Sequence, residues 1–344
     1  MINGWSSFVR GGLCAAVIMY VPACTSAALR APLRLDGGFI QYQPWMAKLD
    51  ERAWQQELEA MRKARMQTIV LQQLQHETTR YIPDSSAAPD PTGIILSYAD
   101  AHGMEVFIGL AVDSGWWKCG QWQDYLDAAA LKNMALADEI WKRYGSHRSF
   151  VGWYLPQEMW EGPFTDEQVA LARHLFHRLS DHCRSLSKDE PKPVALSPFH
   201  TGRVPPSEIE KLYRDLLRGS GVNIVMLQDG VGARGWDDRM ADMVVPYFEA
   251  MERACWANHV EFWANIECFK LVSRTSSGPK EFAPADAQRL SRQLTAVAPF
   301  VRRIVTFDFF HYMSPYRQDE RARKLYEDYV KAGVSATNSS SRSN

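Results

Sequence analysis

Two glutamates occupy positions at which acid–base chemistry is easy to build. Glu158 ends an apolar run over residues 151–158, and Glu267 ends another over residues 261–267. Such short apolar runs are typical of buried strands. Cleavage of a glycosidic bond needs one carboxylic acid to protonate the departing oxygen and a second carboxylate to attack carbon or activate water. The pair suits this reaction, provided that the fold brings the two strand ends together.

Amide side chains and aromatic rings follow the same and neighbouring strand ends. Neutral amides both donate and accept hydrogen bonds, as sugar hydroxyls do. Tryptophan rings can cover the apolar face of a pyranose. We therefore expect the substrate pocket to include Gln157, Gln41, Tyr42, Gln72, Trp116, Trp117, Gln228, Asp229, Trp236, Asn265, His311 and Tyr312.

Other roles remain open for the two glutamates. Glu158 could cap the helix that follows it, and Glu267 could form an ion pair with Lys270 or with an arginine of the barrel. Asp229 ends the sixth predicted strand and is the strongest rival to Glu267 as a nucleophile. Further carboxylates near predicted strand ends are Asp308, Glu161 and Asp113.

The chain alternates between β-rich runs and helical patterns, which is typical of a parallel α/β fold. A doubly wound open sheet is the competing fold, but the glycine-rich phosphate turn that usually marks it is missing from the sequence. We predict a single (β/α)8 TIM barrel over residues 35–332, in which Glu158 and Glu267 follow the fourth and seventh strands. The predicted strands lie near 37–43, 68–75, 105–112, 150–157, 193–199, 222–229, 261–268 and 303–310.

Helical patterns between these strands each have one apolar face. A stripe runs from Leu126 to Trp141. We expect Asp166 to begin the fourth helix and Pro284 with Asp286 to begin the seventh. Connections from helix to strand are short, whereas those from strand to helix are long, which predicts a site on the carboxyl-end face. The long loops are 76–91, 113–122, 158–165, 229–238, 269–283 and 311–317.

The charge balance and the histidine pattern limit the kinds of partner that the protein is expected to bind. The 39 Lys and Arg nearly balance the 40 Asp and Glu, so nothing favours binding of nucleic acid. His174 and His177 lack the HExxH pattern and are expected to face solvent, and we expect neither a metal nor an organic cofactor. His200 and His311 follow predicted strands five and eight and are better placed for the pocket.

Residues 1–24 have the shape of a leader. Arg10 precedes an apolar stretch that ends in small residues before Cys24, and this stretch is too short for a comfortable membrane span. Residues 21–24 resemble a lipobox, so lipidated Cys24 is the favoured membrane attachment, with plain secretion and a buried N-terminal segment as alternatives. The expected location is the periplasm, the outer membrane as a lipoprotein, or outside a bacterial cell.

The remaining cysteines and the C-terminus carry weaker signals. Cys119, Cys183, Cys255 and Cys268 are scattered, and free buried thiols are favoured over a disulfide. The segment 333–344 is polar and is predicted to be a disordered tail.

The placement of Glu158 and Glu267 resembles clan A of the retaining glycoside hydrolases, whose acid/base follows strand four and whose nucleophile follows strand seven. This resemblance implies that Glu158 is the acid/base, Glu267 the nucleophile and Gln157 the partner of a sugar 2-hydroxyl. The clan commonly has Asn where this chain has Gln157, which carries the same amide on a longer stem. A narrower similarity is to the bacterial domain-of-unknown-function 4434 family, over residues 38–41, the Trp54 helix, 68–72 and 153–158.

The sequence thus predicts a glycosidase that cleaves a polysaccharide or oligosaccharide with retention through two glutamates. A carbohydrate-binding barrel of the cell envelope without catalysis is one alternative. A transglycosylase is another, because it shares the covalent intermediate and differs only in the acceptor.

Overall fold

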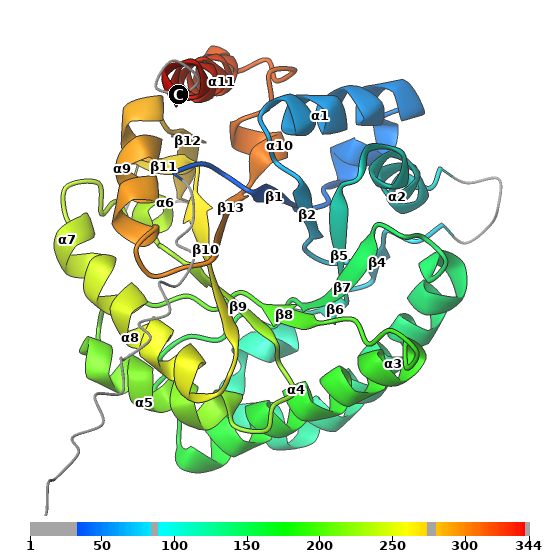
Figure 1. Cartoon of the computed structure of the whole chain (residues 1–344). Coiled ribbons are helices and arrows are strands. Elements are labelled where there is room, and N and C mark those ends of the chain that lie inside the picture. The colour runs from blue at the N-terminus through cyan, green and yellow to red at the C-terminus, as the bar shows by residue number, and fades with distance from the viewer. Residues whose placement is uncertain (1–32, 84–88, 274–279, 341–344) are drawn as a thin grey trace, which may run out of the picture.

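The computed structural model describes residues 33–83, 89–273 and 280–340. Within these ranges, eight parallel strands close into a barrel, with β13 pairing back onto β1 (Figure 1). The predicted (β/α)8 fold is confirmed, and each barrel strand lies inside a predicted range. The strands are β1 (Gly37–Ile40), β2 (Thr68–Leu71), β5 (Glu105–Gly109), β7 (Phe150–Leu155), β8 (Val194–Leu196), β9 (Ile224–Gln228), β10 (Glu261–Glu267) and β13 (Arg303–Phe307).

Large side chains fill the interior of the barrel. Phe39 meets Tyr154 edge to face with ring centroids 5.3 Å apart, and Phe107 meets Trp263 in the same way at 5.7 Å. These residues belong to one buried cluster to which all eight barrel strands contribute. Because side chains alternate between the two faces of a strand, the cluster also identifies the inward-facing residues of each strand. The barrel has a packed centre rather than a pore.

The amino end of the barrel is closed by Arg303. Its guanidinium group lies 5.0 Å from the centroid of the Trp263 ring and forms an ion pair with Glu105. Arg303 Nη1 also donates to Thr68 Oγ1 at 3.2 Å. This polar floor lies below the aromatic layer and at the opposite end from Glu158 and Glu267.

A helix follows each barrel strand and packs its apolar face on the outside of the barrel (Figure 1). Thr165 caps α4 with a reciprocal capping box to Gln168, so the helix begins at Asp166 as predicted. Asp286 caps α9, whereas Pro284 lies in β12 and not at the helix start. The helices are α1 (Glu51–Lys63), α2 (Pro91–His102), α3 (Trp122–Tyr144), α4 (Asp166–Leu186), α5 (Pro206–Leu217), α8 (Val245–Ala257), α9 (Ala287–Val297) and α11 (Glu320–Ser340).

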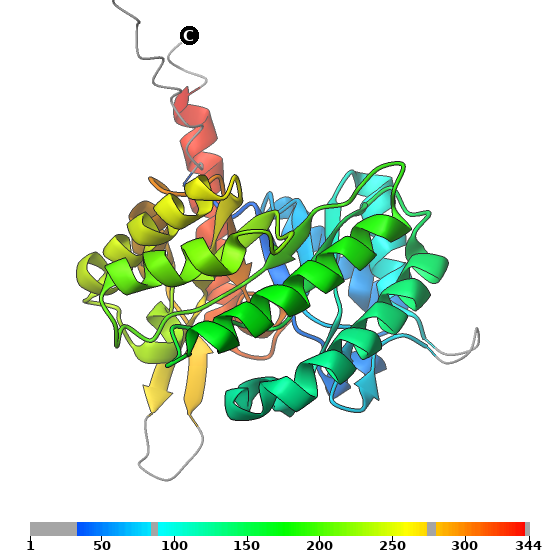
Figure 2. The ribbon, with the colours of Figure 1, turned by 90° about the horizontal axis from the view of Figure 1, so that it is seen from below.

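The loops at the carboxyl ends of the strands contain additional short elements. Figure 2 shows the β11–β12 hairpin and the beginning of α3 at this end of the barrel, and α11 extending beyond the other end. The decorated face is therefore the one at which Glu158 and Glu267 lie. Its short elements are β3 (Gln75–His76), β4 (Thr79–Arg80), β6 (Ala111–Val112), β11 (Phe269–Ser273), β12 (Glu281–Pro284), η1 (Pro44–Lys48), η2 (Ser114–Trp117), η3 (Cys119–Gln121), α6 (Val231–Arg234), α7 (Met240–Met243) and α10 (Phe309–Tyr312).

The predicted leader, residues 1–24, lies outside the described residues. Helix α11 continues to Ser340 and so includes part of the segment 333–344 that the sequence predicted as a tail. Cys183, Cys255 and Cys268 are free and buried. Among the helices of the described ranges, none is long and apolar enough to cross a membrane.

Candidate active site

Glu158 lies three residues beyond β7, the fourth barrel strand. It is half-buried, and its Oε1 accepts a hydrogen bond from Gln228 Nε2 at 3.1 Å. Its main-chain oxygen accepts from Trp116 Nε1 at 2.8 Å. The helix that follows is capped by Thr165, so the capping role considered for Glu158 is not the one it has.

The protein raises the pKa of the Glu158 carboxyl group to about 7, because burial penalises its charged form. The hydrogen bond from Gln228 opposes this shift by stabilising the carboxylate. A carboxyl group with this pKa holds its proton through mildly acidic pH and exchanges it near neutrality. It therefore meets the requirement for a general acid.

Glu267 is the last residue of β10, the seventh barrel strand, and is 4% exposed. It lies on the same face of the strand as Trp263, which belongs to the interior cluster. Its Oε2 accepts a hydrogen bond from the backbone amide of Ala233, in α6, at 2.6 Å. Among the described residues, its carboxylate therefore has a backbone amide as its hydrogen-bond partner, and not the ion pair with Lys270 that was one alternative role.

A buried polar network binds the backbone amide and the main-chain oxygen of Glu267. Asp229 Oδ1 accepts from the amides of Val231 and Glu267, both at 3.2 Å, and Asp229 Oδ2 accepts from Gln293 Nε2 at 2.5 Å. Gln293 Nε2 also donates to the main-chain oxygen of Glu267 at 3.1 Å. Asp229 is fully buried with both oxygens engaged, so the predictions that it binds substrate or rivals Glu267 as nucleophile are wrong.

Burial and the neighbouring Asp229 carboxylate both raise the pKa of Glu267. The α6 amides and the buried guanidinium of Arg289 act in the opposite direction and favour the ionised form. Arg289 is held by an ion pair to Asp237 at 3.0 Å and by the main-chain oxygen of Phe269. The support of Glu267 by Arg289 and the α6 amides was not predicted from the sequence. The alternation of side chains along β9 does, however, place Gln228 inside the barrel and Asp229 outside it.

Amide side chains line the wall between the two glutamates. Gln228, which contacts Glu158, lies opposite Asn265 in the β9–β10 register, and Asn265 is two residues before Glu267 on the same face. Asn265 is 1% exposed and its Nδ2 donates to Ser197 Oγ at 3.0 Å, so the structure commits this predicted contact residue to the scaffold. Polar groups thus continue across β8 and β9 from one glutamate to the other.

A second cluster of polar side chains lies at the carboxyl ends of β1, β2 and β13. Asp308 caps α10 and accepts from the amide of Gln41 at 3.2 Å, while its Oδ2 lies 2.7 Å from His311 Nδ1. Gln41, His311 and Tyr312 are half-buried, and Gln72 is 8% exposed. The structure therefore places these four predicted residues at the same end of the barrel as the glutamates.

Several predicted contact residues have their side chains committed to the scaffold. Trp116 is fully buried, stacks on Trp122 and donates to Glu158, so it cannot present a face to a sugar. Tyr42 is 2% exposed and its hydroxyl is 3.1 Å from Thr92 Oγ1. Gln157 is 1% exposed and donates to the main-chain oxygen of Ala111 at 2.7 Å. Each of these three predictions fails because a nearby buried group already uses the side chain.

The histidines and Trp236 also differ in part from expectation. His200 is buried between Trp236 and Tyr247, with ring centroids 5.1 and 4.1 Å away, and this burial lowers its pKa to about 3. Trp236 is only 6% exposed, so neither it nor His200 is open to the pocket. His174 and His177 are exposed as predicted. In the described ranges, no cluster of three or more His, Cys, Asp or Glu is placed to hold a metal.

The family model described as Domain of unknown function (DUF4434) matches residues 35–319. The chain belongs to this family. No curated protein matches it.

Solved structures share the barrel of this DUF4434 protein at low sequence identity. One is named as a putative alpha-L-fucosidase from Bacteroides thetaiotaomicron VPI-5482, with a TM-score of 0.69, 21% identity, and coverage of 88% of this chain and 96% of that chain. Another is the GH99 endo-alpha-mannosidase from the same genus and species, with a TM-score of 0.50, 11% identity, and coverage of 83% and 86%. At these identities the likeness shows the TIM-barrel fold of glycoside hydrolases.

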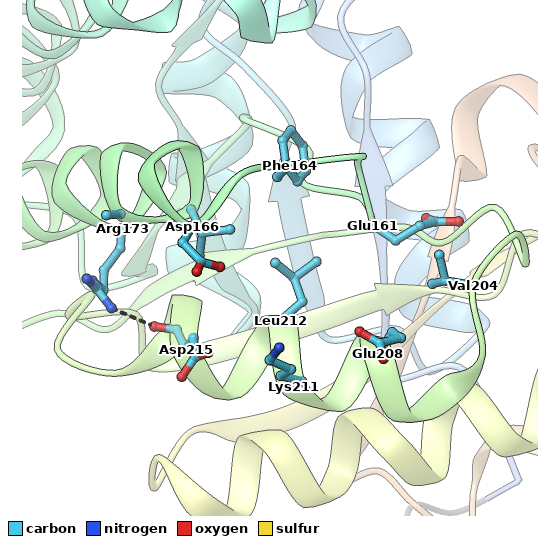
Figure 3. A pocket seen from close by; sticks show the side chains of 11 residues that line it. Glu161, Phe164, Asp166, Arg173, Val204, Glu208, Lys211, Leu212 and Asp215 are labelled. Carbon is cyan, nitrogen blue, oxygen red and sulfur yellow. Dashed lines mark hydrogen bonds between the residues drawn. The ribbon is translucent and has the colours of Figure 1, made fainter.

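A separate hollow of about 330 Å³ lies on the flank of the DUF4434 barrel, between α4 and α5 (Figure 3). Arg173 Nη1 donates to the main-chain oxygen of Asp215 at 3.1 Å across part of this hollow. Glu161 lies at its edge, and its carboxylate accepts from the amide of Thr201 at 2.8 Å. Glu161 therefore stabilises the loop after β8, and neither Glu158 nor Glu267 lines the hollow.

Proposed function

We propose that this protein is a glycoside hydrolase that cleaves a polysaccharide or oligosaccharide. One observation carries the proposal: Glu158 and Glu267 follow strands four and seven at the same end of one closed barrel. The two carboxyl groups also differ in surroundings: Gln228 contacts Glu158, whereas a backbone amide and Arg289 favour the ionised form of Glu267 against the opposing effects of burial and Asp229. The fold shared with glycoside hydrolases supports the same reaction class.

Glu158 acts first as the general acid in this proposal. With a pKa of about 7, its carboxyl group is protonated when substrate binds and gives the proton to the glycosidic oxygen as the bond to carbon breaks. The departing sugar leaves as a neutral alcohol. The same group, now a carboxylate, then accepts a proton from the water that completes the reaction.

Glu267 acts as the nucleophile. Its carboxylate attacks the anomeric carbon and forms a covalent glycosyl–enzyme intermediate, which water hydrolyses with net retention. The amide of Ala233 and the charge of Arg289 favour the ionised carboxylate that this attack needs. Asp229 and Gln293 hold the backbone at Glu267 and so fix the direction of its side chain.

The direct test uses a polysaccharide panel with the wild-type protein and with Glu158→Gln, Glu267→Gln and Glu320→Gln. Glu320 is a matched control, because its side chain is 91% exposed on α11. We expect the first two variants to lose at least ~10² in turnover and the control to match wild type. NMR of the first product should show the anomeric configuration of the substrate.

Two outcomes contradict the proposal. Full turnover by either catalytic variant removes that glutamate from its role. Inverted product with both glutamates essential replaces the covalent intermediate by direct attack of water.

A further inference from the structure

Three aromatic rings form a continuous group beside Glu158, here called the aromatic shelf: Trp117, Trp160 and Phe199. The ring centroids of Trp160 and Phe199 lie 6.1 Å apart with planes only 6° from parallel. Trp117 contacts both, at 5.5 Å from Trp160 and 6.3 Å from Phe199. These residues come from the loops after three successive barrel strands, β5, β7 and β8, so the shelf follows the rim of the barrel at the carboxyl ends of its strands.

Hydrogen bonds tie the shelf to the backbone around Glu158. The amide of Phe199 donates to the main-chain oxygen of Met159 at 2.9 Å. Trp116, the residue before Trp117, donates through Nε1 to the main-chain oxygen of Glu158. These two hydrogen bonds therefore connect the loops that carry Trp117 and Phe199 to the backbone at Glu158 and Met159.

The shelf differs from the other tryptophan clusters of the barrel in its exposure. Trp117 is 47% exposed, and Trp160 and Phe199 are half-buried, whereas Trp116, Trp122, Trp153 and Trp263 are buried. Phe164 packs edge to face against Trp160 at 4.8 Å and supports the shelf from below. The guanidinium group of Arg234 lies 5.8 Å from the Phe199 ring and borders the shelf on the side of α6. An apolar surface of fixed shape with a polar border suits the face of a pyranose ring.

We infer that the aromatic shelf binds the sugar on the leaving-group side of the scissile bond. This inference rests on the proposed function, since the general acid must contact the oxygen that departs with that sugar. The shelf extends to both sides of Glu158, because Phe199 follows β8, which lies between β7 and β10, whereas Trp117 follows β5, on the other side of β7. The Trp117 end of the shelf is therefore the end that lies away from Glu267. A ring stacked on Trp117 therefore lies beyond the proton donor, away from the nucleophile.

Binding and turnover test the inference separately. In the binding arm, calorimetry measures cellohexaose, xylohexaose, mannohexaose, chitohexaose and isomaltohexaose against wild type, Trp117→Ala, Trp117→Phe and Trp256→Ala. Trp256 is the control, since it is 80% exposed on α8. We expect Trp117→Ala to weaken binding about tenfold, Trp117→Phe to restore most of it and Trp256→Ala to match wild type.

In the turnover arm, each protein cleaves the bound oligosaccharide and the matching glycosyl fluoride, which carries no leaving-group sugar. We expect the loss in kcat/KM caused by Trp117→Ala to be about tenfold larger on the oligosaccharide than on the fluoride. Equal losses on both substrates would place the shelf against the retained sugar and overturn the assignment.

The two proposals fail in different ways. Turnover that depends on Glu158 and Glu267, with Trp117→Ala binding like wild type, refutes the shelf alone. A protein without turnover whose glycan binding depends on Trp117 refutes the hydrolase and keeps the shelf as a sugar-binding surface. Wild-type protein that binds none of the five hexasaccharides at millimolar concentration overturns the shelf.

Discussion

The surroundings of Glu158 and Glu267 differ although both residues lie at the carboxyl end of a strand of the same barrel. Glu158 is half-buried, and a side-chain amide, that of Gln228, contacts its carboxyl group. Glu267 is almost fully buried and accepts from a backbone amide of α6, with Asp229 and Arg289 nearby. Burial raises the pKa of both carboxyl groups, and at Glu267 the Asp229 carboxylate adds to this upward shift while the α6 amides and Arg289 oppose it. The proposed roles therefore follow from strand position, which gives the proton to Glu158 after strand four and the charge to Glu267 at the end of strand seven.

The largest expected effect separates these roles by the leaving group. A glycosyl fluoride departs without protonation, so Glu158→Gln should retain most of the first step on this substrate while losing at least ~10² on an oligosaccharide. Glu267→Gln should lose at least ~10² on both, because the nucleophile is needed for either. The kcat/KM for fluoride release, which reports the first step alone, and the kcat/KM by reducing-sugar assay on the oligosaccharide measure the two losses. If both variants lose the same factor on each of the two substrates, the assignment of different roles to Glu158 and Glu267 is wrong.

A smaller effect is expected from Asp229→Asn, which removes a negative charge beside Glu267 with little change in shape. Asp229 raises the pKa of Glu267, so the substitution should lower that pKa. The nucleophile must be ionised, and the acidic limb of kcat/KM should therefore move to lower pH by about one unit. Asp328→Asn, in an exposed pair with Lys324, is the control and should leave the limb in place. A limb that moves to higher pH contradicts the assignment of charge to Glu267.

The smallest effect is expected from Gln228→Leu, which should move the basic limb of the pH profile of kcat/KM. The amide of Gln228 stabilises the Glu158 carboxylate, so its loss should raise the pKa of Glu158 above about 7. Because the acid works protonated, activity falls as pH rises through this pKa, and the limb should shift to higher pH by up to ~1 unit. Exposed Gln67, at the amino end of the barrel, provides the control Gln67→Leu. An unchanged basic limb shows that another group titrates there.

Much of the fold could be predicted from the sequence because its signals are local. Apolar runs and alternating helix patterns placed all eight barrel strands, and their order put Glu158 and Glu267 on one face. Strand alternation also carried a signal that was not used: Gln228 and Asp229 are adjacent and must point to opposite sides of β9. The rivalry of Asp229 with Glu267 could have been excluded on that ground.

The fate of the loop aromatics could not be predicted in this way. Trp116 and Trp117 are neighbours, yet one is buried and the other 47% exposed. The difference arises because Trp116 Nε1 meets the main-chain oxygen of Glu158, a residue 42 positions away in sequence. The α6 amide at Glu267 is likewise 34 positions away. Contacts of this range are set by barrel closure, and no local pattern of residue types encodes them.

The arginine that seals the amino end of the barrel also determines the route of every reactant. The buried aromatic cluster fills the centre of the barrel, and Arg303 lies at its amino end, against Trp263 and paired with Glu105. Water, glycan and products must all pass the same rim. The water that returns a proton to Glu158 in the second step must therefore enter from the side on which the severed chain departs. A slowly leaving product would consequently also delay the reprotonation of Glu158.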